Sequence, residues 1–229
     1  MSLASVRARI EAACARAGRD PAEVRLVGVS KGRSPDEIRP LVRAGLLDLG
    51  ENRVQEWRDK APDLPAEVRW HFVGNLQRNK VKYLAAGGVP WIHSLNSDRL
   101  AQELSEQAVR RDHRFTALIE VDVAREPTKQ GAAVDDVAAL LERCRALPGL
   151  EVAGLMAMAP YADDPERTRP AFRELVALAD ALGLKERSIG MSRDFEIAIE
   201  EGATLVRVGT ALWEADRPVP AEIEEAKCD

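Results

Sequence analysis

The chain has 229 residues, of which 45% are hydrophobic and 31% are charged, and its formal net charge is −5. A pI near 5.5 argues against a general nucleic-acid-binding protein, because neutralising backbone phosphates needs an excess of Lys and Arg. No apolar run approaches the roughly 18 to 20 residues that cross a bilayer, and Arg7, Arg9 and Glu11 stand where a signal peptide needs an apolar segment. We therefore expect a cytoplasmic protein without a membrane span.

The first element that the sequence predicts is a helix over about residues 3–17, and eight short apolar runs follow it. Segments with the apolar spacing of a helix separate these runs, as at Ile38, Leu41 and Val42. Residues 34–37, with the sequence SPDE, are typical of a helix start, since they offer a capping hydroxyl, a first-turn proline and acidic residues. The predicted strands cover residues 24–30, 46–50, 68–74, 91–95, 116–123, 150–158, 187–192 and 204–212.

Strands that alternate with helices pair in parallel, because each return to the sheet needs a crossover. Eight such strands favour a closed (β/α)8 TIM barrel over an open doubly wound sheet, although periodicity alone does not decide closure. No linker interrupts the pattern, so we predict a single domain over residues 1–229. The barrel is expected to occupy about residues 20–214, and the acidic, proline-interrupted segment 215–229 to form a tail.

Neither the cysteines nor the histidines form the pattern of a metal site. The three cysteines are far apart and never in a CxxC pair, and the three histidines contain no HExxH or i,i+4 pair. We therefore predict no metal site and no disulfide framework. These residues are Cys14, Cys144, Cys228, His71, His93 and His113.

Polar residues at the carboxyl ends of barrel strands are candidates for function, because these ends face a shared active-site mouth. Lys31 closes the first apolar strand in a chain that has few lysines compared with arginines. Partial desolvation there would favour the neutral amine, which is nucleophilic toward an aldehyde. A lysine that reaches solvent or pairs with Glu51 is the alternative interpretation, and position alone leaves it open.

The seventh and eighth strands end in GMSRD and RVGT. Gly190 and Gly209 would let backbone amides approach an anion, while Ser192 and Thr210 add hydroxyl donors. The amides after Ser192 are expected to open the helix DFEIAIEEG, whose positive end favours an anion. Alternatively, Ser192 only caps that helix and Gly209 only forms a tight turn. Together the two adjacent strand ends favour a phosphate site.

A strand-end lysine and a phosphate site together indicate an aldehyde-bearing phosphorylated cofactor, pyridoxal 5′-phosphate (PLP), held as a Schiff base. Six motifs, in order from about residue 24 to residue 212, resemble the pyridoxal phosphate homeostasis proteins, the YggS-like and PROSC-like group. The motifs are VGVSKGRSPDEI, LGENRVQE, WHFVGNLQRNKV, IHSLNSDRLA, GLMAMAP and SIGMSRDFEIAIEEGATLVRVGTAL.

The resemblance implies a PLP-binding barrel of the alanine racemase N-terminal domain type. It implies that Lys31 carries PLP covalently as a Schiff base. It further implies that Ser192, Gly209 and Thr210 hold the phosphate, with assistance from the backbone of Met191.

By the same resemblance, Asn52 and His71 are pocket-lining polar residues and Met158 is the apolar wall beside the ring. Arg207 would direct its guanidinium at the pyridine nitrogen. A guanidinium donates hydrogen bonds, keeps its own protons and cannot accept another, so the ring nitrogen would stay unprotonated and act as a poor electron sink. The alternative for Arg207 is an ion pair at the rim, with Glu51 or Asp194.

The resemblance implies a protein that stores or delivers PLP in intracellular homeostasis, with no catalytic residues and no turnover. The alternative hypothesis is a PLP-dependent racemase or lyase of unknown substrate. Such an enzyme needs a second base; Tyr83 is in a predicted helix, Tyr161 could approach the barrel mouth, and little chain follows the eighth strand. A third hypothesis is a module that hands PLP to apo-enzymes. The resemblance favours a monomer or weak dimer.

Overall fold

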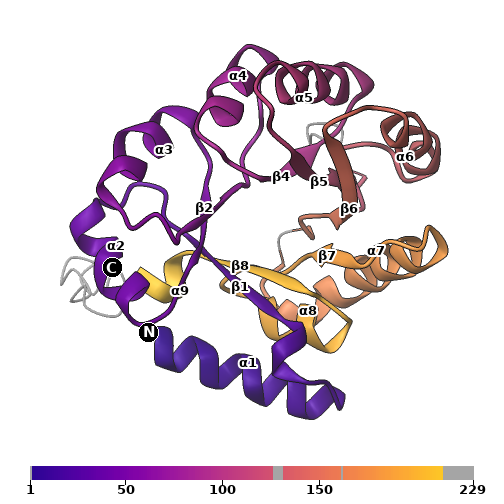
Figure 1. Cartoon of the computed structure of the whole chain (residues 1–229). Helices are drawn as coiled ribbons and strands as arrows, with labels where there is room; N and C mark the ends of the chain where they lie inside the picture. The colour runs from indigo at the N-terminus through magenta and orange to yellow at the C-terminus, as the bar shows by residue number, and fades with distance from the viewer. Residues whose placement is uncertain (1, 126–130, 161, 214–229) are drawn as a thin grey trace, which may run out of the picture.

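The computed structural model describes residues 2–125, 131–160 and 162–213, and within these ranges eight strands close into a barrel (Figure 1). The strands follow one another around the barrel in chain order, and the eighth pairs with the first. Every neighbouring pair is parallel. They are β1 (Arg25–Val29), β2 (Asp48–Glu51), β3 (Arg69–Phe72), β4 (Trp91–Leu95), β5 (Phe115–Glu120), β6 (Leu150–Met156), β7 (Glu186–Ser188) and β8 (Leu205–Val208).

The helices lie outside the ring of strands (Figure 1). The predicted (β/α)8 barrel with an additional N-terminal helix is therefore confirmed, while the predicted tail, 215–229, lies outside the described residues. The helices are α1 (Leu3–Ala17), α2 (Pro35–Arg43), α3 (Val54–Lys60), α4 (Arg78–Ala86), α5 (Asp98–Arg110), α6 (Val137–Arg145), α7 (Arg169–Ala181), α8 (Phe195–Glu200) and α9 (Thr210–Trp213).

The N-terminal helix α1 has a defined start and end. The Ser2 hydroxyl accepts from the amide of Ser5 at its start, and Gly18 ends it in the left-handed conformation that suits glycine. Helix α1 packs beside α8, where Arg9 pairs with Glu196 at 2.7 Å (Figure 1). Its apolar face is buried through Leu3, Val6, Ile10, Ala13 and Cys14.

The loop from β1 to α2 is fixed by a capping box. The Glu37 amide donates to Ser34 Oγ at 3.4 Å, and Glu37 Oε2 accepts from the Ser34 amide at 2.8 Å. Gly32, which adopts φ 68°, donates its amide to Glu56 Oε2 at 2.9 Å. These bonds set the path of the chain on the carboxyl side of Lys31.

The apolar core surrounds the barrel and extends between its strands and helices. Cys14 and Cys144 are buried and unpaired, whereas Cys228 lies outside the described residues. The described residues include no helix long and apolar enough to cross a membrane. In the same ranges, no cluster of three or more acidic, histidine or cysteine side chains is arranged to hold a metal ion.

Gly154 allows β6 to pair closely with β7. A Cβ at this position would lie 1.9 Å from the carbonyl oxygen of Glu186, a backbone atom that cannot move aside independently. Gly154→Ala is therefore expected to lower the free energy of unfolding by about 1–3 kcal/mol in urea denaturation. Gly209→Ala is the matched comparison, because its nearest neighbour would be 3.6 Å away, and equal losses in both variants would contradict the steric explanation.

Candidate functional site

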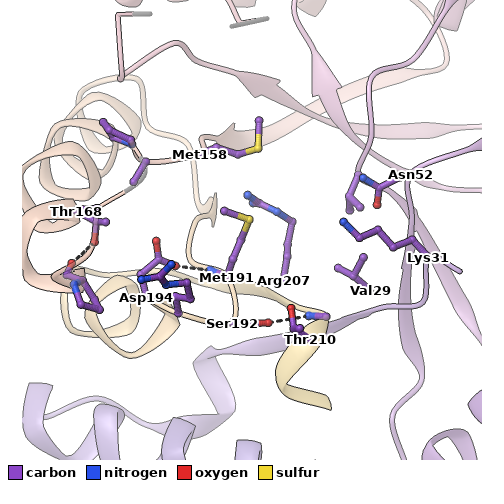
Figure 2. A pocket seen from close by; sticks show the side chains of 17 residues that line it. Val29, Lys31, Asn52, Met158, Thr168, Met191, Ser192, Asp194, Arg207 and Thr210 are labelled. Carbon is purple, nitrogen blue, oxygen red and sulfur yellow. Dashed lines mark hydrogen bonds between the residues drawn. The ribbon is translucent and has the colours of Figure 1, made fainter. Parts of the chain in front are cut away.

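A cavity of about 440 Å³ opens at the carboxyl ends of the barrel strands (Figure 2). Residues that follow β1, β2, β3, β6, β7 and β8 line it. The structure brings eight of the nine predicted site residues together around this cavity: Lys31, Asn52, Met158, Met191, Ser192, Arg207, Gly209 and Thr210.

Lys31 extends its side chain into the cavity from the loop after β1 (Figure 2). The side chain is exposed, as in the alternative interpretation of a lysine that reaches solvent, so the prediction of partial desolvation is wrong. The alternative pairing with Glu51 does not occur either. The buried Glu51 carboxylate instead accepts from Ser30 Oγ at 2.7 Å and from Lys60 Nζ at 2.6 Å.

Lys60 is the second lysine near the end of β1, and its amine is held in other contacts. Its side chain is 7% exposed, and Nζ also donates to the carbonyl oxygen of Ser30 at 2.9 Å. This buried ion pair with Glu51 fastens the residue that precedes Lys31. Of these two lysines, Lys31 is therefore the one whose amine faces the cavity.

The loops after β7 and β8 are joined through Ser192. Its Oγ accepts from the amides of Gly209 at 3.2 Å and Ala211 at 3.3 Å. Trp213 Nε1 donates to the carbonyl oxygen of Val29 at 2.8 Å, which holds α9 against the end of β1. Backbone amides at the start of α9 and the Ser192 hydroxyl thus gather at one side of the cavity (Figure 2).

Two details of the predicted phosphate site differ in the structure. Helix α8 begins at Phe195 after Asp194, so Ser192 neither caps it nor directly precedes its first amides. The Met191 amide, expected to assist the phosphate, donates to Asp194 Oδ1 at 2.6 Å. Gly190 permits this tight turn with φ 88°, since a Cβ there would lie 2.8 Å from the Cα of Phe195.

Arg207 reaches the cavity from a buried position on β8 (Figure 2). Its Nη1 donates to the carbonyl oxygen and the Oγ of Ser188, both at 2.6 Å, and its Nη2 donates to the carbonyl oxygen of Ala157 at 3.1 Å. Burial lowers its pKa to about 10, while Asp194 and Glu120 oppose the shift, so the group is cationic at neutral pH. The predicted alternative, an ion pair at the rim, is not what holds it.

Asn52, Met158 and Met191 complete the lining. Asn52 Oδ1 is buried and has no hydrogen-bond partner among the described residues. Met158 and Met191 are 39% and 38% exposed, which is unusual for large apolar side chains and suits a surface that a ligand covers. The sequence reasoning missed several other lining residues, among them Val73 after β3 and Thr168 at the end of the 3-10 helix Pro165–Thr168, because single short apolar or hydroxyl side chains carry no distinctive pattern.

His71 does not line the cavity, and its predicted role there is corrected. It lies within β3 and is buried. The residue that lines the cavity from the loop after β3 is Val73. The His71 ring stacks on Trp91 with centroids 5.3 Å apart. Its nitrogens lie 3.1 Å from Asp48 Oδ1 and 2.9 Å from His93 Nε2.

Glu120 is a charged residue near the site that the sequence reasoning missed. It is buried at the end of β5, where burial raises its pKa to about 7; Arg207 lowers that pKa in part and Asp122 adds to the increase. The available signal was an acidic residue inside the apolar run TALIEVDV.

The raised pKa of Glu120 predicts a pH-dependent stability. The folded carboxyl holds its proton up to about pH 7 and the unfolded one only to about 4.5, so its contribution to stability is lost as the pH rises through this window. From pH 5 to pH 8, Glu120→Gln should gain roughly 2 kcal/mol relative to the parent protein in urea unfolding. The exposed Glu151→Gln serves as the control, and a pH-independent difference for Glu120→Gln would contradict the prediction.

The fold and the strand-end residues together define a barrel of the class described as the alanine racemase N-terminal domain, whose family model matches residues 1–216. Within that class, the chain belongs to the family of pyridoxal phosphate homeostasis proteins, as the sequence motifs predicted. The pyridoxal phosphate homeostasis protein of Deinococcus radiodurans is 47% identical over 214 residues, covering 93% of this chain and 100% of the relative.

The corresponding protein of Aquifex aeolicus is 45% identical over 218 residues, covering 92% of this chain and 95% of the relative. A solved structure of PipY from Synechococcus elongatus, with PLP bound, is 32% identical. The match covers 90% of this chain and 99% of that chain, with a TM-score of 0.77. The similarity therefore extends over nearly the whole length of both proteins.

Proposed function

We propose that this protein binds PLP as a Schiff base on Lys31 and acts in intracellular PLP homeostasis, storing or delivering the cofactor without turnover. The observation that carries the proposal is the convergence of an accessible amine, a buried guanidinium and the loops after β7 and β8 on one cavity. The names of the relatives and the PLP in the PipY structure support it.

The residues present fit the cofactor. A volume of about 440 Å³ lies in the range of small-molecule sites. The buried Asn52 Oδ1 lacks a partner among the described residues, and the exposed faces of Met158 and Met191 offer an apolar wall for a planar ring. When bound, PLP supplies an aldehyde that condenses with a primary amine, with loss of water.

Lys31 provides the amine. Its exposed side chain is free of the Glu51 carboxylate, because Lys60 and Ser30 occupy that carboxylate. Condensation requires the neutral form of a primary amine as the nucleophile. The Lys60–Glu51 pair holds the backbone of Ser30, the residue before Lys31, in place.

Ser192, Gly209 and Thr210 hold the phosphate in this proposal. The bonds from the Gly209 and Ala211 amides to Ser192 Oγ, at 3.2 and 3.3 Å, are at the long end of the usual range, so an anion can compete for these donors. The Thr210 side chain lines the same side of the cavity and adds a hydroxyl.

Arg207 faces the pyridine nitrogen in this proposal and acts only as a donor. Because it is cationic and cannot accept a proton at neutral pH, it disfavours a protonated ring. A neutral ring is a poor electron sink, so the site is suited to holding the cofactor more than to stabilising carbanions. This is the physical reason for proposing storage without turnover.

The racemase or lyase hypothesis needs a second base at the cavity. Tyr83 lies on α4, where its ring is near Arg58 and the lysines of that helix, and it does not line the cavity. Tyr161 lies outside the described residues. Loaded protein incubated with L- and D-alanine in deuterated water should exchange the α-hydrogen no faster than free PLP does; faster exchange would overturn the absence of turnover.

The attachment site is tested by borohydride reduction of the loaded protein followed by peptide mapping. Borohydride converts the Schiff base to a stable secondary amine, so the pyridoxyl group should be found on the peptide that contains Lys31. A protein that remains colourless with PLP, or a group on Lys60 or another lysine, would overturn the proposal.

In this proposal, PLP is delivered to other proteins from the same site. We propose that apo PLP-dependent enzymes are the recipients and that the protein acts in the cytoplasm as a monomer or weak dimer. Mixing loaded protein with an apo-enzyme and a scavenger of free PLP separates direct transfer from release. Activation of the apo-enzyme despite the scavenger is expected for direct transfer; its absence would contradict it.

A further inference from the structure

A chain of hydrogen bonds links Arg207 to Asp48 at the opposite end of the barrel. Arg207 Nη1 donates to Ser188 Oγ at 2.6 Å, and Ser188 Oγ lies 2.9 Å from His93 Nδ1. His93 Nε2 lies 2.9 Å from His71 Nδ1, and His71 Nε2 lies 3.1 Å from Asp48 Oδ1. The five side chains come from five strands, and all of them are buried.

The series of hydrogen bonds begins at a cation, Arg207, and ends at an anion, Asp48. Asp48, the first residue of β2, also accepts from Arg69 Nε at 2.9 Å and Nη2 at 2.5 Å. Burial acts to raise the pKa of Asp48, but the hydrogen bonds from His71 and Arg69 outweigh it and hold that pKa well below its usual range. Asp48 is therefore ionised and can only accept hydrogen bonds, so His71 must be the donor in the bond between them.

One direction of donors satisfies every link with both imidazoles neutral. His71 donates from Nε2 to Asp48, which leaves its Nδ1 as an acceptor for His93 Nε2–H. His93 Nδ1 then accepts from the Ser188 hydroxyl, whose oxygen accepts from Arg207. The reverse direction would require a protonated His71 and would point His93 Nδ1–H at Ser188.

The surroundings favour the neutral arrangement. Burial lowers the pKa of both imidazoles. For His71 the hydrogen bond to Asp48 opposes this shift in part, while Arg25 and Arg69 add to it. For His93 the neighbouring His71, Arg207 and Arg25 all add to it. The charged groups around the two rings are Asp48, Arg69, Arg25 and Arg207. A further positive charge would therefore be both desolvated and close to existing cations.

We propose that Ser188, His93 and His71 are positioning residues that hold Arg207 in a fixed orientation toward the cavity, with Asp48 as the anchor. Described residues accept three of the five N–H hydrogens of Arg207, so its remaining donors have a defined direction. The effect on PLP rests on the proposed function, whereas the hydrogen-bond chain itself does not.

A purely structural role explains the chain poorly. The interior of such barrels is usually filled by layers of branched apolar side chains, which need no hydrogen-bond partners. A buried polar network stabilises a protein only when every member is satisfied, and apolar replacements are often equally stable. The hydrogen bonds from Asp48 to Arg207 are fully connected, and they end on a residue that lines the cavity. This arrangement indicates that the series orients Arg207.

The first test uses the protein without PLP. Nitrogen-15 NMR of the histidine side chains should show His71 and His93 as neutral rings with the proton on Nε2 between pH 6 and pH 8. His113 is not part of this hydrogen-bonded series, because it bonds the carbonyl oxygen of Val89, and it provides the reference signals. A proton on Nδ1 of His93, or a doubly protonated His71, would overturn the proposed direction.

The second test removes one link. Ser188→Ala takes away the hydroxyl but keeps the backbone carbonyl that Arg207 also uses. It should weaken PLP binding about tenfold, as expected for a lost hydrogen bond to a charged group. It should also shift the absorbance maximum of the loaded protein and its pH profile. Ser188→Thr should restore the spectrum, because it restores the hydroxyl.

A matched control is His113→Gln, which should leave the affinity and the spectrum unchanged. Circular dichroism confirms that each variant is folded, and His93→Gln extends the series if it folds. Wild-type affinity, spectrum and pH profile in Ser188→Ala would overturn the positioning role. If the parent protein binds no PLP, the proposed function fails, while the tautomer measurement still tests the chain.

Discussion

Lys31→Ala is expected to abolish the yellow colour of the loaded protein and the adduct that borohydride fixes. The Schiff base needs a primary amine at the cavity, and Lys60, the other lysine near the end of β1, is buried in its ion pair with Glu51. Retention of PLP would then depend on the phosphate loops and Arg207 alone. We expect the dissociation constant to rise on the order of 100-fold, equivalent to roughly 2.7 kcal/mol.

Two further variants make this result specific. Lys31→Arg keeps the positive charge but cannot condense with an aldehyde, so it should be as colourless as Lys31→Ala. Lys185→Ala removes an exposed lysine just before β7, at the opposite end of the barrel, and should retain full colour. Spectrophotometric titration with PLP measures all three. A coloured Lys31→Ala protein would show that the amine lies elsewhere.

The alternation of strands and helices was enough to predict the barrel, because each apolar run is short and each intervening segment has helical spacing. Strand ends were less predictable. The run 204–212 was expected to be one strand, yet β8 ends at Val208 and α9 begins at Thr210. The β-branched and apolar residues of VGTAL are compatible with either structure, and the bond from Trp213 to Val29 favours the helix through tertiary contact.

The cavity residues were predicted better than their surroundings. Lys31 and Arg207 belong to the motifs SKG and RVGT that close the first and eighth predicted strands, so both could be placed at the cavity although the exact strand boundaries could not. Depth inside the barrel is not encoded in such motifs. Alternation along β3 gives the side to which His71 points, but not the layer in which it lies. The partners of His71 come from β2 and β4, and pairing register was needed to find them.

Long-range charge partners were likewise outside the reach of local patterns. The sequence suggested that Glu51 could pair with Lys31 or Arg207, but the structure pairs it with Lys60 at the end of α3. Lys60 had no feature that distinguished it from a solvated helix residue. Its burial depends on how α3 packs across the ends of β1 and β2, which is a property of the assembled barrel.

Lys60→Met is expected to lower the free energy of unfolding by about 3–5 kcal/mol, because it leaves the Glu51 carboxylate buried without its cation. Glu51 is 1% exposed, and only Ser30 Oγ among its side-chain donors would remain to compensate the charge. Urea unfolding measures the loss. The expected side effect is a looser backbone before Lys31, since Lys60 also holds the Ser30 carbonyl.

The double variant Lys60→Met/Glu51→Gln decides whether the uncompensated charge is the cause. Removing both charges should leave the protein at least about 2 kcal/mol more stable than Lys60→Met alone, because breaking a buried pair costs more than replacing it. Lost packing of the Lys60 methylenes would instead give the same loss in both variants. That outcome would contradict the electrostatic explanation and assign Lys60 to the packing of α3 against the barrel.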